Sequence, residues 1–243
     1  MSLFSRLLVL VCTLAGVAAL SSLGVWQVQR LHWKEALLAQ IDSRRHGAPE
    51  PLADVEARYA TTGDVDYFPV RLTGTFDHGG ESYFYTTHEG QAGWDVFAPL
   101  TLEDGRVIFV DRGFVPMARR DPSTRTEGQI AGALTVIGLA RNPLSAKPNS
   151  FVPENDVPAR TLYWRSLADM ARIAGVEPAS ALPFYVDAGP APNPGGLPVG
   201  GTTLISLPNN HFGYAVTWFG LAVALAGVGG WFLFTRRSPL PGA

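Results

Sequence analysis

The chain has 243 residues, of which 47% are hydrophobic and only 16% are charged. An ordinary soluble protein carries about 25% charged residues, so the deficit indicates stretches that avoid water. The net charge of -2 gives no basic surface for nucleic acid, and the single cysteine, Cys12, excludes an internal disulfide and a CxxC redox motif.

The first apolar segment runs from Leu7 to Val25 without a charge and follows Arg6. A membrane helix needs ~20 apolar residues, whereas the apolar part of a signal peptide usually has only ~7–15. Ala18-Ala19 offers a candidate cleavage site, but the helical pattern continues beyond it. Its one face carries Trp26, Arg30, Trp33 and Leu37. We therefore predict an uncleaved transmembrane helix over residues 7–29 whose outer end projects into water.

The second apolar segment is uncharged from Phe212 to Phe234, again long enough to cross a bilayer. We predict a transmembrane helix over residues 211–234. Its first turn can be capped by Asn209 or Asn210, because an Asn side chain accepts a hydrogen bond from a free backbone N–H.

Charges at the ends of the two spans predict their orientation. Arg6 precedes the first span and Arg236-Arg237 follow the second, and positive charge marks the cytoplasmic side. Residues 1–6 and 235–243 are then cytoplasmic, and residues 30–208 form an extracytoplasmic domain. No Arg- and Ser-rich presequence precedes the first span. We therefore expect a multi-pass protein of a bacterial inner membrane with a periplasmic domain.

The domain between the spans has mostly strand patterns. Residues 44–63 are polar and contain two prolines, so we expect a loop there, with at most a helical turn. Alternation from Phe68 to Phe76 predicts a strand, with 82–87 as its hairpin partner. A second hairpin is expected over 94–102 and 106–110, around Glu103-Asp104-Gly105.

The rest of the domain adds further short elements. We expect strands at 130–140, 182–186 and 202–207, and an irregular Gly- and Pro-rich segment over 188–201. Residues 166–174 read as a helix, with Ser166 as its N-cap and Gly175 as its stop. Several strands and one helix predict a mainly antiparallel β domain with a short helix, flanked by the two transmembrane α-helices.

Catalytic motifs of the hydrolases, zinc proteases, P-loop proteins and dinucleotide-binding proteins are absent from the sequence, so we expect no enzyme. His78 and His88 lie on adjacent predicted strands and could approach each other, but two histidines alone are weak grounds for a metal site, and surface turns are the favoured interpretation. Asp111 and Arg112 point to opposite faces of an extended strand, and we interpret the segment that ends in Gly113 as structural.

His211 stands at the start of the second span and admits three interpretations. It can polarise the helix start, hydrogen-bond another protein, or ligate a metal, most plausibly haem iron. Tyr214 and Trp218 share its helical face. The hairpin brings Trp26, Arg30 and Trp33 to a similar depth, so aromatic faces could pack a macrocycle while Arg30 or Lys34 meets its propionates. The same aromatics could instead form an interfacial belt.

Four ordered motifs carry a resemblance to a known family. They are Leu23-Gly24-Val25-Trp26-Gln27-Val28-Gln29-Arg30-Leu31-His32-Trp33-Lys34, Pro69-Val70-Arg71-Leu72-Thr73-Gly74-Thr75-Phe76, Val110-Asp111-Arg112-Gly113-Phe114-Val115-Pro116 and Asn209-Asn210-His211-Phe212-Gly213-Tyr214-Ala215-Val216-Thr217-Trp218-Phe219. The chain resembles the Surfeit-locus-one family of cytochrome c oxidase assembly factors. That family often has Asn and Trp in place of Asp111 and Phe114, and Leu-Gln in place of Phe212-Gly213.

The resemblance implies a membrane-bound assembly factor that binds haem a as transient cargo and helps its insertion into the catalytic subunit of haem–copper oxidase. It implies His211 as the haem ligand, while Trp26, Arg30, Tyr214 and Trp218 are pocket residues by our geometric inference. The implied partners are that catalytic subunit, the haem a synthase and the lipid bilayer, with no nucleic acid. The alternative is a scaffold without cofactor, for which Gly220, Ala224, Gly227 and Gly230 would suit close helix contact.

Overall fold

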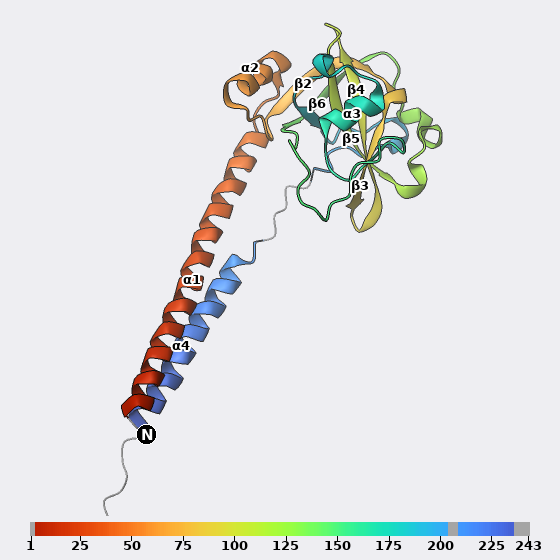
Figure 1. The fold of residues 1–243 in the computed structure, drawn as a ribbon. Helices are drawn as coiled ribbons and strands as arrows, with labels where there is room; N and C mark the ends of the chain where they lie inside the picture. Colours follow the sequence, from red (N-terminus) through yellow and green to blue (C-terminus); the bar gives the residue numbers. More distant parts are fainter. Residues whose placement is uncertain (1–2, 204–208, 236–243) are drawn as a thin grey trace, which may run out of the picture. The chain divides into compact units, whose positions relative to one another are not determined.

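The computed structural model describes residues 3–203 and 209–235, and the chain forms two compact units. One unit is made by the two ends of the chain, Met1–Gln40 and Ser206–Ala243, and the other by Ile41–Ile205. Figure 1 shows a pair of long helices in the first unit and a strand-rich body in the second. The predicted division into two apolar helices and a β-rich domain is confirmed.

Helices α1 (Leu3–Arg45) and α4 (His211–Thr235) form the first unit, apart from the last turn of α1. Both are long and apolar enough to cross a membrane. At 1.5 Å per residue, the 43 residues of α1 extend ~65 Å, about twice the ~30 Å hydrocarbon core of a bilayer. The helix predicted for residues 7–29 therefore continues without a break to Arg45.

Small residues let α1 and α4 lie side by side in opposite directions (Figure 1). A Cβ atom on Gly24 would lie 2.7 Å from the Phe219 ring, and one on Gly229 would lie 2.4 Å from the hydroxyl of Thr13. Ala215 and Ala222, seven residues apart, are buried in the same helix pair. By contrast, Gly220, Gly227 and Gly230 have open space beside them.

A closed β-barrel forms the second unit. Strands β2 (Pro69–Phe76), β6 (Ala133–Arg141), β8 (Tyr185–Ala188), β5 (Val107–Pro116) and β4 (Gln91–Leu102) pair in that order, and β4 returns to β2. Only the β5–β8 pair in this ring is parallel. Strands β3 (Ser82–His88) and β7 (Thr161–Leu162) continue outward from β4, and β1 (Glu50–Pro51) pairs with β2.

Gly74 is the residue at which the barrel closes. It pairs with Leu134 of β6 on one side and with Leu102 of β4 on the other. A Cβ atom at this position would lie 2.4 Å from the carbonyl oxygen of Thr101, closer than a real contact allows. Only glycine lets the two backbones approach this closely while β2 serves both neighbours.

Two apolar clusters lie on opposite faces of the barrel wall. The interior cluster includes the inward side chains Val70, Leu72, Ile108, Val110 and Val186. The second cluster packs Phe97, Phe109 and Tyr185 on the outer face beneath α3 (Leu167–Ala174). The β4–β5–β8 wall is therefore covered on both sides, as the near-continuous apolar runs of β4 and β5 require.

Helix α2 (Leu52–Thr62) corrects the prediction of a loop over residues 44–63. The interior cluster receives Leu52, Val55 and Tyr59 from one face of α2, spaced three and four residues apart. The prolines indicated a loop, but Pro51 lies just before the first helical residue, where a missing N–H costs nothing.

Strand pairing corrects the first predicted hairpin. Residues 82–87 do form a strand, but β3 pairs with β4 and not with β2. The short helix η1 (His78–Gly80) between them redirects the chain. The hairpin of β4 and β5 is confirmed, and β5 continues through Asp111 to Pro116, beyond its predicted end at Val110.

The remaining predictions hold in most respects. Ser166 caps α3 by accepting a hydrogen bond from the backbone N–H of Asp169, and Gly175 ends it in the left-handed region. The strand predicted for 182–186 is shifted to Tyr185–Ala188. In the segment predicted as irregular, 188–201, Ala188 still belongs to β8, and the rest is irregular apart from η5 (Pro194–Gly196) and a β-bridge from Val199 to Phe114. Of the strand predicted for 202–207, Thr202 and Thr203 are irregular and the rest lies outside the described residues. Other short helices are η2 (Met117–Arg119), η3 (Pro122–Gly128) and η4 (Pro178–Ser180).

Replacement of Gly74 by alanine should destabilise the barrel, because the new methyl group must push Thr101 away. We expect a loss of about 2 kcal/mol and a Tm lower by roughly 4–8 °C, measured by circular dichroism on the full chain in detergent. The neighbouring change Thr73→Ala, on the exposed face of the same strand, is the control. A Gly74→Ala protein that melts with the wild type would contradict closure through this contact.

Candidate functional site

His211, the first residue of α4, makes a hydrogen bond to Gln27 of α1. The distance from His211 Nδ1 to Gln27 Oε1 is 2.6 Å, and Gln27 is buried in the helix pair, 9% exposed. Next to it, the Oδ1 atom of Asn209 is buried without a hydrogen-bond partner among the described residues. The two helices therefore present a polar centre where their sequences otherwise offer mainly apolar surface.

The hydrogen bond determines which ring nitrogen is available. A carbonyl oxygen can only accept, so with Gln27 Oε1 as partner a neutral imidazole donates from Nδ1 and keeps a lone pair on Nε2. Nothing among the described residues forms a hydrogen bond with Nε2. This is the arrangement of a ligating histidine, whose other nitrogen is held by a carbonyl or carboxylate. The donor set therefore fits a metal that takes imidazole.

The predicted pocket residues lie close to this centre along the two helices: Trp26 and Arg30 lie within three residues of Gln27, and Tyr214 and Trp218 lie three and seven residues after His211. Trp26 is 53% exposed and Tyr214 is 56% exposed, so both present their rings to the surroundings of the helix pair. The guanidinium of Arg30 stacks on the ring of Trp33 at 3.8 Å. Trp218 is half-buried. The contact that the sequence prediction missed is Gln27, whose place beside Trp26 in the first motif was its only signal.

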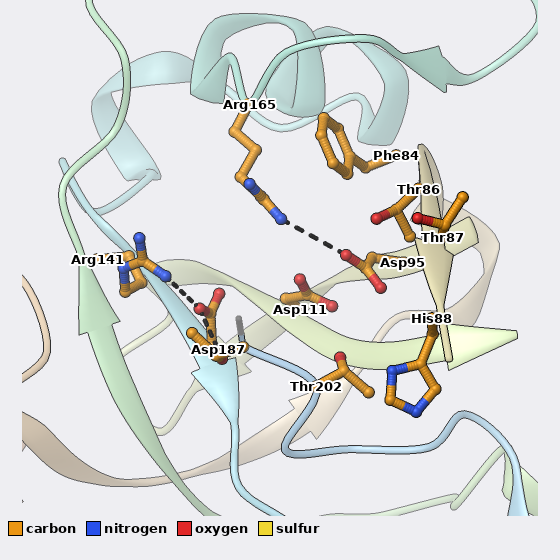
Figure 2. A pocket seen from close by; sticks show the side chains of 11 residues that line it. Phe84, Thr86, Thr87, His88, Asp95, Asp111, Arg141, Arg165, Asp187 and Thr202 are labelled. Carbon is orange, nitrogen blue, oxygen red and sulfur yellow. Dashed lines mark hydrogen bonds and ion pairs between the residues drawn. The ribbon is translucent and has the colours of Figure 1, made fainter. Parts of the chain in front are cut away.

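A polar pocket in the β unit is a second candidate (Figure 2). Three adjacent strands each contribute an aspartate to its lining: Asp95 from β4, Asp111 from β5 and Asp187 from β8. Asp111 and Asp187 are direct partners in the parallel pair. The cavity measures about 200 Å³, and Phe84, Thr86, Thr87, His88 and Thr202 complete its labelled lining.

Two arginines pair with two of these three acids. Arg141 Nη1 lies 2.6 Å from Asp187 Oδ2, which also accepts a hydrogen bond from Thr203 at 2.9 Å. Arg165 Nη2 lies 3.5 Å from Asp95 Oδ2. Asp111 lies between these pairs and accepts a hydrogen bond only from the backbone N–H of Gly113 among the described residues, at 2.9 Å.

Burial and mutual repulsion make two of the acids weak. Burial raises the pKa of Asp95 to about 6, and Asp187 adds repulsion that Arg165 opposes. Burial also raises the pKa of Asp111 well above its usual range, and the charges of Asp95 and Asp187 raise it further. Burial and the neighbouring charges therefore favour the protonated form of Asp111, and no sequence pattern indicated this, because the three acids come from separate strands.

Arg112 points to the opposite face from Asp111, as predicted, and joins a buried charged cluster. Its guanidinium lies 3.7 Å from Glu81, which also pairs with Arg125. Burial alone would raise the pKa of Glu81, but hydrogen bonds from His78 and Arg125 and the charges of both arginines lower it. Gly113 adopts φ 109, and Val199 exchanges backbone hydrogen bonds with Phe114, so the segment organises the fold.

The two domain histidines have separate partners. His78 Nε2 contacts the carbonyl of Ile130 at 3.1 Å, whereas His88 packs against Phe114 at the pocket. Among residues 3–203 and 209–235, no three His, Cys, Asp or Glu side chains are placed to hold a metal ion.

Comparison with known proteins identifies the family. The model of the SURF1 family matches residues 14–223, nearly the whole chain. The chain belongs to the SURF1 family. It is 37% identical to Surfeit locus protein 1 of Homo sapiens over 235 residues, which covers 89% of this chain and 74% of that protein. The mouse protein of that name is 35% identical over 235 residues, with 90% and 73% covered.

A more distant relative supports the same assignment across the chain. Surfeit locus protein 1 of Takifugu rubripes is 33% identical over 219 residues, covering 83% of this chain and 87% of that protein. The matched residues 14–223 of this SURF1 family member include Gln27, the three pocket aspartates and His211.

The raised pKa values of Asp95 and Asp111 predict a stability that falls as pH rises. The folded chain binds these protons more tightly than the unfolded chain, so the stability they provide is complete below about pH 4 and is lost as the pH rises through 6 and above. Asp111→Asn should stabilise the full chain at pH 8 by about 1–3 kcal/mol and flatten this profile. Denaturant unfolding from pH 5 to 8 measures it.

The control for this prediction is Asp54→Asn, at an exposed position on α2. This change should leave the pH profile as in the wild type, because Asp54 is solvated. An Asp111→Asn protein that is less stable than the wild type at pH 8 would show that the Asp111 carboxylate is ionised and needed there.

Proposed function

We propose that this SURF1 family member is a membrane-anchored assembly factor of cytochrome c oxidase that binds haem a at His211 and helps its insertion into the catalytic subunit. The family is known for cytochrome oxidase assembly factors. The observation that carries the haem proposal is the 2.6 Å hydrogen bond from His211 to Gln27, which leaves Nε2 free for a metal.

The residues around His211 have defined tasks in this proposal. The imidazole of His211 would hold the iron of haem a through Nε2, and the haem would supply the metal that takes this ligand. Gln27 orients the imidazole, the exposed rings of Trp26 and Tyr214 pack the apolar macrocycle, and Arg30 meets a propionate. Trp218 packs one turn further along α4 from Tyr214. An open site of this kind suits cargo that must be released to the oxidase subunit.

The proposed location is a bacterial inner membrane, with both termini in the cytoplasm and the barrel in the periplasm. The two apolar helices support membrane anchoring. The orientation depends on Arg6 and on Arg236 and Arg237, of which the last two lie outside the described residues. We expect the haem a synthase as donor of the cargo and no catalytic activity in the chain itself.

A protein scaffold without cofactor is the alternative. It is favoured by Gly220, Gly227 and Gly230, which have open space beside them, so that another transmembrane helix could approach α4 closely there. Both functions predict loss of active oxidase on deletion. Only the haem carrier predicts an absorption band in the purified protein.

Replacement of His211 by alanine should remove the haem band. We expect the wild type, purified in detergent from cells that make haem a, to show an absorption band that is lost or shifted in His211→Ala. The neighbouring change Phe212→Ala, at an exposed position of α4, is the control. A band of equal position and height in His211→Ala would move the ligand elsewhere, and no band in either protein would favour the scaffold.

Substitutions of Gln27 should distinguish the orientation of the imidazole by Gln27 from the ligation of iron by His211. Gln27→Leu removes the acceptor and should weaken haem a affinity by roughly 10–100-fold while His211 is still present. Gln27→Glu keeps a hydrogen-bond acceptor for the imidazole and makes the imidazole a stronger electron donor to the iron. The absorption band should therefore persist, and the reduction potential of the haem should fall. Gln29→Leu, two residues along on the exposed face, is the control. Equal affinity in Gln27→Leu and the wild type would contradict the orienting role.

A further inference from the structure

The pocket on the outer wall of the barrel contains buried polar atoms that have no hydrogen-bond partner among the described residues. Asp187 is 6% exposed, and its Oδ1 atom accepts no hydrogen bond from the described residues. Nε of Arg165 likewise donates to none of them. Leaving such a buried group unpaired costs about 1–3 kcal/mol, so native proteins normally supply a partner. In Figure 2 the carboxylate of Asp187 and the guanidinium of Arg165 both face the space beside Asp111.

The charges of the pocket leave one acid without a cation. Arg141 is paired with Asp187 and Arg165 with Asp95, but Asp111 has only the N–H of Gly113. One additional positive charge would give three cations for three carboxylates. It would also offset the repulsion between Asp111 and the neighbouring carboxylates, since an opposite charge within a few ångströms favours the ionised form.

The lining selects the kind of cation. The described side chains bring no three metal ligands together. Carboxylate and threonine hydroxyl oxygens are acceptors for N–H donors. A cavity of about 200 Å³ has room for a guanidinium or an aminoalkyl group and is too small for a porphyrin. The cavity is therefore distinct in chemistry from the site at His211.

We propose that this pocket binds an organic cation through its N–H groups, a primary ammonium or a guanidinium, with Asp111 and the free oxygen of Asp187 as acceptors. The cation is carried by a small molecule or by a lysine or arginine side chain of a protein. Asp111 and Asp187 are partners in the parallel β5–β8 pair, so their carboxylates receive donors of the same group. The proposal does not depend on haem binding, because none of its residues belongs to the helix pair.

Calorimetric titration of the full chain in detergent tests the proposal, with methylammonium and methylguanidinium as probes. Tetramethylammonium carries the same charge without N–H donors, and Mg²⁺ tests for a metal site. We expect binding of one or both N–H cations and none of the two comparison ions. Binding that is absent, equal for tetramethylammonium, or confined to Mg²⁺ would overturn the proposal.

Variants locate the binding. Asp111→Asn removes the unpaired acid while keeping its size, and should weaken binding about tenfold or more, since a charged hydrogen bond is lost. Asp54→Asn, exposed on α2, should bind as the wild type does. Unchanged affinity in Asp111→Asn would place the cation elsewhere and overturn the assignment. A short peptide with one lysine or arginine, compared with the free probes, distinguishes a protein side chain from a small molecule.

The pH dependence adds a measurement that needs no variant. The groups that face the cavity are Asp95, Asp111, Asp187, Arg141, Arg165 and His88, with Tyr185 beneath it. Because a bound cation favours ionised carboxylates, affinity for the N–H cations should rise between pH 5 and pH 8. Affinity that stays constant over this range would contradict the involvement of Asp111.

Discussion

The return of β4 to β2 is the constraint on which the rest of the domain depends. Residues 74–76 of β2 pair with residues 100–102 of β4, and Gly74 and Thr75 pair at the same time with β6 on the other side, which the missing Cβ of Gly74 allows. The first part of β4 is then left to pair with β3, outside the ring. Closure also fixes β4, β5 and β8 as neighbours in register, and only this register brings three aspartates from distant parts of the chain together.

The two clusters of buried charged residues differ in how the protein compensates the burial of their carboxylates. Glu81 has no exposed surface, yet two arginines and a histidine keep its carboxylate ionised. Removing one partner from such a cluster typically costs 3–5 kcal/mol, so we regard it as structural. On the outer wall, three acids share two arginines, and burial together with the charges of the other two acids raises the pKa of Asp111. The carboxylate of the first cluster is compensated by its own neighbours, whereas the described residues compensate the carboxylates of the second cluster only in part.

Local patterns in the sequence predicted the elements they determine. The alternation of apolar and polar residues predicted β2, and the Asp-Gly turn predicted the β4–β5 hairpin. Ser166 and Gly175 predicted the two ends of α3. Strand pairing was harder to predict than the strands themselves. The sequence predicts that β3 pairs with β2, because strands that follow one another along the chain usually pair, and no local pattern indicates that the barrel closes. The helix pair was predicted from apolar length, and His211 from its place at a helix start. Gln27 and the three aspartates could not be selected as site residues from the sequence. Their chemistry depends on burial and on contacts between residues that lie 16 to 184 positions apart in the chain.

The hydrogen bond between Gln27 and His211 joins residues 184 positions apart, one near each end of the chain. A ribosome adds roughly 5–20 residues per second, so ~10–40 seconds separate the synthesis of the two partners. During that interval α1 can already be folded, while the polar centre lacks its imidazole. The centre is thus completed only when α4 is made, and a chain that stops before His211 has α1 but lacks this hydrogen bond. In the proposed haem carrier, the order of synthesis would keep unfinished chains from competing for the cargo.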